Sequence, residues 1–196
     1  MQKQGKYLHM MGLSMSLERK RIDEMIDDIL KKEGGYVNDK NDPGRATNRG
    51  ITIGTYSKWL KRPATIQEVK DITEEIAREI YEVNYLVKPR IDTLPDLIMP
   101  QMFDISINSG PKNAIKLLQR LINLAGFGII SVDGIMGPST RGKAETMVAE
   151  MGNYAVNALV EERLKFYQRI VDRRPASGKF LRGWTNRANS FKLPVD

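Results

Sequence analysis

The sequence contains no cysteine and a single histidine, His9, among its 196 residues. A zinc-dependent amidase or metallopeptidase needs a cluster of His, Cys and carboxylate ligands, and a cysteine peptidase needs a thiol. A Ser-His-Asp triad needs a histidine inside the folded domain, whereas we predict that residues 1–16 form a disordered tail. These absences exclude most peptidase and amidase chemistries, leave a Ser-Lys nucleophile open, and imply no metal and no cofactor.

Long apolar runs are also absent. No segment approaches the roughly 20 apolar residues of a membrane-spanning helix. Residues 7–15 are mildly apolar, but no persuasive small-residue cleavage site follows them. We therefore expect a protein that is synthesised in the cytoplasm without a clear signal peptide and has no membrane span.

Acidic residues are fewer than basic ones, 24 against 31, which gives a formal net charge of +7. Such an excess favours association with polyanions such as cell-wall carboxylates and phosphates, nucleic acid or anionic lipid. Surface solvation is the simpler alternative. The basic residues are spread along the chain, and no helix-turn-helix or RNA-binding motif is present, so we predict no nucleic-acid partner.

Glu33 is a carboxylate at a position where the pattern calls for an apolar residue. Apolar residues recur at three- and four-residue steps over residues 16–32, which predicts an amphipathic helix. Glu33 continues this stripe, three residues after Leu30 and seven after Ile26. Partial burial keeps a carboxylic acid protonated near neutral pH, as a general acid requires. The alternative is a solvated last-turn residue before the two glycines that follow.

A polar loop rich in Asn, Asp, Gly and Pro follows Glu33 and predicts tight turns or a short irregular hairpin. Asp42 stands nine positions after Glu33, and Thr47 stands five positions after Asp42. An inverting glycoside hydrolase uses one carboxylic acid to protonate the leaving oxygen and a second group to hold a water, with carboxyl groups roughly 6.5–9.5 Å apart. The loop supplies candidates for the second group.

This layout resembles that of phage-type lysozymes, and EGGYVNDKNDPGRATNRGIT (residues 33–52) resembles the signature of the glycoside hydrolase 108 family of N-acetylmuramidases. Residues 80–85 and 103–110 resemble the rest of that catalytic domain. Residues 132–140 and 180–187 resemble the predicted peptidoglycan-binding region usually fused to it. The sequence departs from the family where Arg45 replaces a second glycine and where Leu86 follows Tyr85 in place of tryptophan.

The resemblance implies a mainly α fold, with a lysozyme-like catalytic domain over residues 17–125 and a helical peptidoglycan-binding-like lobe over 126–196 packed on it. Local signals predict helices at 53–61, 99–109 and 153–172, a capping box at Thr65, and helices beginning at Pro111 and Pro138. Aromatic residues Phe180, Trp184 and Phe191 are expected in the core of the lobe.

The resemblance also implies hydrolysis of the β-1,4 bond between N-acetylmuramic acid and N-acetylglucosamine in peptidoglycan glycan strands. Glu33 would be the general acid, and Asp42 with Thr47 would orient the water. The glycan would be contacted or supported by four further residues: Tyr36, Tyr85, Asp104 and Asn108.

Two alternatives keep the same scaffold. A lytic transglycosylase needs only one catalytic carboxylate, so Asp42 would be dispensable. A non-catalytic protein that binds the wall or assists secretion would keep the fold without the reaction. As in prophage endolysins, action at the cell wall or periplasm would follow release by a separate holin-like factor. The oligomeric state is left open.

Overall fold

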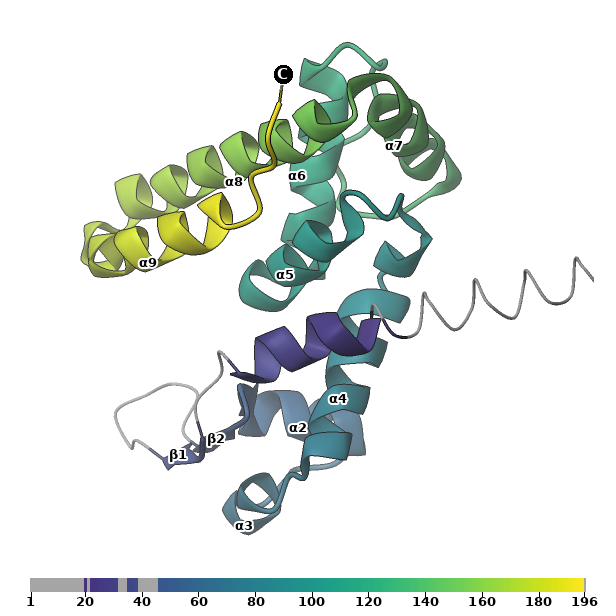
Figure 1. The fold of residues 1–196 in the computed structure, drawn as a ribbon. Coiled ribbons are helices and arrows are strands. Elements are labelled where there is room, and N and C mark those ends of the chain that lie inside the picture. The colour runs from purple at the N-terminus through teal and green to yellow at the C-terminus, as the bar shows by residue number, and fades with distance from the viewer. Residues whose placement is uncertain (1–19, 21, 32–34, 39–45, 196) are drawn as a thin grey trace, which may run out of the picture. The chain divides into compact units, whose positions relative to one another are not determined.

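The computed structural model describes residues 20, 22–31, 35–38 and 46–195. The chain forms two compact units, residues 1–83 and 84–196, and each is considered by itself (Figure 1). The fold is mainly α-helical with one small sheet, which confirms the predicted class. None of the helices in the described ranges has the length and apolar character needed to cross a membrane.

The first unit combines a helix over residues 22–31 with a three-stranded antiparallel sheet and three further helices. The strands are β1 (Val37–Asn38), β2 (Ala46–Asn48) and β3 (Ile51–Thr52), in the order β1-β2-β3. The helices are α2 (Ile53–Leu60), α3 (Ile66–Lys70) and α4 (Glu74–Tyr81). The core includes Ile26, Ile51 and Ile80, each fully buried.

Side-chain caps fix where these helices begin. The hydroxyls of Thr52, Thr65 and Thr73 accept backbone N–H groups in the first turns of α2, α3 and α4. At α3, Glu68 also accepts from the backbone N–H of Thr65, which completes the predicted capping box. Each cap satisfies an otherwise unpaired donor, so the start of each helix is encoded locally.

The second unit is helical. After the π-helix η1 (Glu82–Val87), in which the boundary between units falls, come η2 (Ile91–Thr93), α5 (Met99–Ser109), α6 (Pro111–Leu124), α7 (Pro138–Met151), α8 (Asn153–Arg173), η3 (Pro175–Ser177) and α9 (Gly178–Asn189). Helix α5 packs on α6, α6 on α7 and α8, and α9 along α8 (Figure 1). Helix α5 is buried over most of its length.

The aromatic residues of α9 depart in part from the prediction. Trp184 and Phe191 are half-buried and pack against a cluster of Val160, Tyr167 and Ala188, as expected. Phe180 is 51% exposed and stacks on Trp184 with ring centroids 5.8 Å apart. The compact units change at residue 83, while the predicted domain boundary at residue 125 stays a prediction.

Candidate functional site

The predicted site residues fall on both units and partly outside the described chain. Glu33 and Asp42 lie outside the described residues. Tyr36 and Thr47 belong to the first unit. Tyr85, Asp104 and Asn108 belong to the second unit. The described geometry therefore concerns the surroundings of each residue within its own unit.

Thr47 occupies the middle of the central strand β2. It pairs with Val37 of β1 and Thr52 of β3. Its neighbours Ala46 and Asn48 are buried, whereas Thr47 is half-buried, because successive side chains of a strand point to opposite faces. The Thr47 hydroxyl makes no hydrogen bond with another described residue.

Asn48 fixes the position of this strand. Its Nδ2 donates to the backbone oxygens of Val69 at 3.1 Å and Lys70 at 2.9 Å, at the end of α3. The Nζ of Lys70 lies 6.0 Å from the ring centroid of Tyr36, which precedes β1 and is half-buried. The sheet and α3 thus hold Tyr36 and Thr47 on one framework.

A charged recess of about 390 Å³ adjoins the helix that precedes Glu33 in the sequence. Arg78 binds Asp27 of that helix and donates to Glu74 at 3.1 Å, while Arg49 lies 3.7 Å from Glu74. The recess is lined by Asp27, Leu30, Lys31, Arg49, Glu74 and Arg78. These contacts tie the first helix, α4 and the turn between β2 and β3 together.

In the second unit, Tyr85 lies on the π-helix η1, and its backbone oxygen accepts a hydrogen bond from Ser106 Oγ of α5 at 2.7 Å. Single π-helical turns are frequent at functional sites because they displace side chains from the α-helical path. Leu86 is fully buried. The position at which the sequence departs from the family's tryptophan is therefore a core position in this protein.

Asp104 lies inside the second unit rather than on its surface. Its Oδ2 accepts from Arg163 Nη2 of α8 at 2.5 Å, and its Oδ1 accepts from Arg187 Nε of α9 at 2.9 Å. Arg163 Nε also donates to the hydroxyl of Tyr167 at 2.6 Å, and burial raises the pKa of that phenol. Both carboxylate oxygens of Asp104 are thus used to join α5 to α8 and α9.

Asn108, one turn further along α5, has an exposed side chain. Its Nδ2 donates to the backbone oxygen of Asp104 at 2.7 Å. Arg163 and Arg187 were not identified from the sequence, although a polar residue at an otherwise apolar helix position such as Asp104 signals that buried partners exist. Arg163 and Arg187 lie 59 and 83 residues after Asp104, so the sequence does not indicate which residues pair with it.

The turn before α7 depends on Gln119 of α6. Its Nε2 donates to Asp133 Oδ1 at 2.9 Å and to Thr140 Oγ1 at 3.3 Å, and its Oε1 accepts from Gly134 N at 2.9 Å. The hydrogen bond from Gln119, followed by that from Ile135 N, lowers the pKa of Asp133. Asp133, Gly134 and Thr140 therefore have structural roles in this turn.

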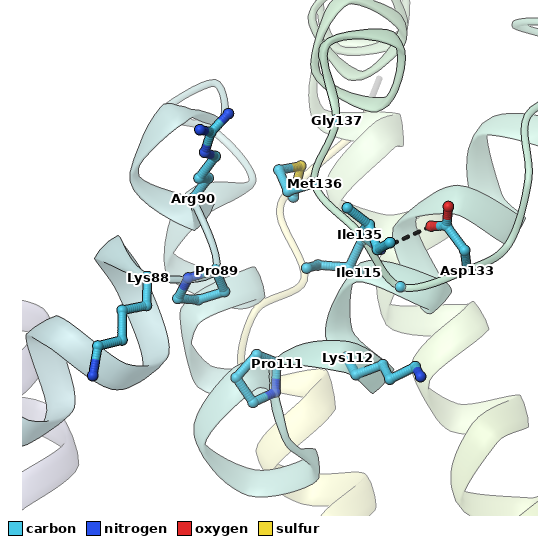
Figure 2. Close-up of a pocket in the computed structure, with 11 residues that line it drawn as sticks. Lys88, Pro89, Arg90, Pro111, Lys112, Ile115, Asp133, Ile135, Met136 and Gly137 are labelled. Atoms are coloured by element: carbon cyan, nitrogen blue, oxygen red, sulfur yellow. Dashed lines mark hydrogen bonds between the residues drawn. The ribbon is translucent and has the colours of Figure 1, made fainter. Parts of the chain in front are cut away.

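Figure 2 shows an open pocket of about 660 Å³ at this turn. Ile115, Ile135 and Met136 lie close together on one side of the pocket and Pro111 lies below them, whereas the side chains of Lys88 and Arg90 extend away from them (Figure 2). It is lined by residues 88–90, 111, 112, 115 and 133–137. Within the described ranges, no three His, Asp or Glu side chains are grouped so that they could hold a metal ion.

Comparisons with known proteins concern the family and the fold. A family model described as Glycosyl hydrolase 108 matches residues 26–110, and a model described as Predicted Peptidoglycan domain matches residues 113–189. The fold is similar to the solved structure of SagA from Brucella abortus, with 32% sequence identity and a TM-score of 0.74 over 89% of this chain and 92% of that chain. No curated protein matches the sequence.

Proposed function

This chain belongs to the glycosyl hydrolase 108 family and is a lysozyme-type glycoside hydrolase of peptidoglycan, and we propose that it cleaves the β-1,4 bond between N-acetylmuramic acid and N-acetylglucosamine with Glu33 as general acid. The observation that carries the proposal is the family match over residues 26–110, which includes Glu33, Asp42 and Thr47. Glu33 protonates the glycosidic oxygen. Asp42 and Thr47 orient the attacking water.

The surroundings of Thr47 support its part in the reaction. Its hydroxyl has no partner among the described residues, and Asn48 holds its strand against α3. A group that positions a water must itself be held in place, because catalysis falls steeply with small misplacements. In the second unit, Tyr85 and Asn108 contact the glycan. Asp104 acts as a positioning residue, since Arg163 and Arg187 occupy both of its carboxylate oxygens.

The domain boundaries of the proposal are those expected from the sequence, a catalytic domain over residues 17–125 and a binding lobe over 126–196. The site of action is the cell wall, where the substrate lies. Release by a separate holin-like factor and a role in prophage lysis belong to the proposal as well.

The test is loss of turbidity of purified peptidoglycan with wild type and Glu33→Gln, followed by mass analysis of the soluble products. Loss of a general acid lowers the rate by about 10²–10⁴-fold. Glu24→Gln is the matched control, because Glu24 is exposed on the preceding helix. Its ion pair with Lys20, at 3.8 Å, lies on the surface and contributes little to stability. We expect the control to clear the suspension at the wild-type rate.

The products distinguish the reactions. Reducing N-acetylmuramic acid ends indicate hydrolysis, whereas anhydro-muramyl ends indicate a lytic transglycosylase. Full activity of Glu33→Gln would refute the assigned mechanism. Binding of peptidoglycan without clearing by either protein would indicate a wall-binding role without catalysis.

A further inference from the structure

A groove of about 350 Å³ lies between α6 and α8 in the second unit. Four of its lining residues carry positive charge and none carries negative charge; the lining residues are Asn113, Lys116, Arg120, Phe166, Arg169, Ile170 and Arg173. The groove is separate from the pocket of Figure 2, with which it shares no lining residue.

Most of this charge is not compensated. Lys116, Arg120 and Arg173 form no ion pair or side-chain hydrogen bond with another residue in the part of the chain that the structure describes. Arg169 donates to Glu162 at 3.0 Å, and its side chain is still 40% exposed while that of Glu162 is 5% exposed. The groove therefore presents an excess of cationic donors to solvent.

Without a bound anion, the spacing of these cations lowers the stability of α6 and α8. Lys116 and Arg120 are four residues apart on α6, and Arg169 and Arg173 are four residues apart on α8. Like charges at this spacing lie one above the other on a helix and destabilise it. Clustering of charge at the expense of stability is expected where an anionic ligand binds.

All seven lining residues lie in the region that matches the peptidoglycan-domain family, residues 113–189. In peptidoglycan, the carboxylates are concentrated in the short peptides attached to the glycan, and these peptides also carry alanine methyl groups. The half-buried side chains of Phe166 and Ile170 give the groove an apolar wall beside its cations. The cations of the groove can bind the carboxylates of the peptides, and its apolar wall can contact their methyl groups.

We propose that the groove between α6 and α8 binds the acidic peptide stems of peptidoglycan, with Lys116, Arg120 and Arg173 binding stem carboxylates and Phe166 and Ile170 contacting the alanine side chains. The proposal rests on peptidoglycan being the substrate of this protein. It adds a contact to the peptide, beyond the glycan that the enzyme cleaves.

The test uses the full chain with Glu33→Gln as parent, so that the wall is not digested, and measures co-sedimentation with sacculi freed of teichoic acids. The groove variant adds Lys116→Gln and Arg120→Gln. The matched control adds Lys165→Gln and Lys179→Gln, which remove the same charge at exposed positions outside the groove. Thermal unfolding of each protein verifies folding, and we expect the groove variant to be at least as stable as its parent because repulsion is relieved.

We expect the groove variant to bind sacculi about tenfold or more weakly than the parent, and the control to bind as the parent does. A soluble tetrapeptide stem should compete with the parent for sacculi, and glycan strands stripped of peptide should compete poorly. Equal binding by the groove variant, or equal competition by stripped strands, would overturn the proposal. Binding that requires teichoic acid would assign the groove to phosphate polymers instead and would also overturn it.

Catalysis is measured separately, by the products released by wild type. Normal glycan cleavage by wild type, together with equal binding of sacculi by the groove variant and its parent, would refute only the groove. Normal stem-dependent binding without glycan cleavage would refute only the proposed reaction.

Discussion

Replacing Asp104 with asparagine should strongly destabilise the second unit. The side chain of Asp104 is 5% exposed, that of Arg163 is 0% exposed and that of Arg187 is 20% exposed. Asparagine keeps the shape of aspartate but carries no charge, and it places an NH₂ group against one of the two guanidinium donors. The substitution leaves two cations without a counterion where little water can reach them.

The expected decrease in the free energy of unfolding is about 3–5 kcal/mol, the cost of removing one partner of a buried ion pair. The arginines have little means of compensation. Arg163 Nη1 and Arg187 Nη2 are already buried without a hydrogen-bond partner among the described residues. Because folded domains are stable by only about 5–15 kcal/mol, the effect should be evident in urea unfolding.

Trp184 can report this transition. Its ring centroid lies 5.3 Å from that of Tyr167, which accepts a hydrogen bond from Arg163. Fluorescence should be followed in a Trp59→Phe background, since Trp59 is the other tryptophan of the chain. This background isolates the signal of the second unit.

Two further variants make the experiment specific. Asp172→Asn is the matched control, because Asp172 is exposed on α8 and accepts only a surface hydrogen bond from Gln168, and it should change the free energy of unfolding by less than about 0.5 kcal/mol. Adding Arg163→Met to Asp104→Asn removes one uncompensated charge, so the double variant should lose less than the sum of the single variants. A loss below about 1 kcal/mol in Asp104→Asn, together with weaker glycan binding, would refute the structural role and make Asp104 a sugar ligand.

Two other predictions concern local geometry and pH. Gly134 has φ +80°, and an added Cβ would lie 2.8 Å from the backbone oxygen of Lys112, so Gly134→Ala should lower the free energy of unfolding by about 1–3 kcal/mol in urea unfolding. Gly142→Ala, in an open position of α7, should instead raise it by about 0.5–1 kcal/mol, and equal effects would contradict this reasoning. Hydrogen bonding to Arg62 lowers the pKa of Glu68 from its ordinary 4.5 to about 2, so its stabilising contribution is complete above pH 4.5 and is lost as the pH falls towards 2. The difference in Tm between wild type and Glu68→Gln should shrink over that range, and a constant difference would argue against it.

The features that could be predicted from sequence are those encoded by neighbouring residues. The predicted helix over 99–109 matches α5, and Pro111 and Pro138 begin α6 and α7 as expected. A proline at the first turn or a Thr cap followed by Glu acts within a few residues, so its effect does not depend on the rest of the fold.

The features that could not be predicted depend on distant residues. The change from α4 to a π-helix at Glu82 is not marked by the apolar periodicity of the sequence. The polar positions of α5 could be recognised as a stripe, but whether they face solvent or buried arginines is decided by helices far along the chain. Phe180 was expected in the core, but it lies at the end of the aromatic cluster, where it stacks on Trp184 and remains exposed to solvent.

The physical boundary between the units differs from the boundary between the family matches. The glycosyl hydrolase match ends at residue 110 and the peptidoglycan-domain match begins at 113, whereas the compact units divide at residue 83. Helix α5 therefore belongs to the hydrolase match by sequence and to the C-terminal helices by packing. Gln101 of α5 reinforces this assignment, because in the amide orientation that satisfies both of its polar atoms it donates to Val156 O and accepts from Val160 N of α8.

In this arrangement, Asp104 has a structural role in the second unit. The carboxylate of Asp104 binds one arginine from α8 and one from α9, so it joins α5 to both of these helices. Asn108, one turn away on the same helix, keeps an exposed side chain. Because the two residues share one helix, the ion pairs of Asp104 also fix the backbone that carries Asn108, the residue that we propose contacts the glycan. Helices α8 and α9, which lie in the peptidoglycan-domain match, thereby hold α5, which lies in the hydrolase match.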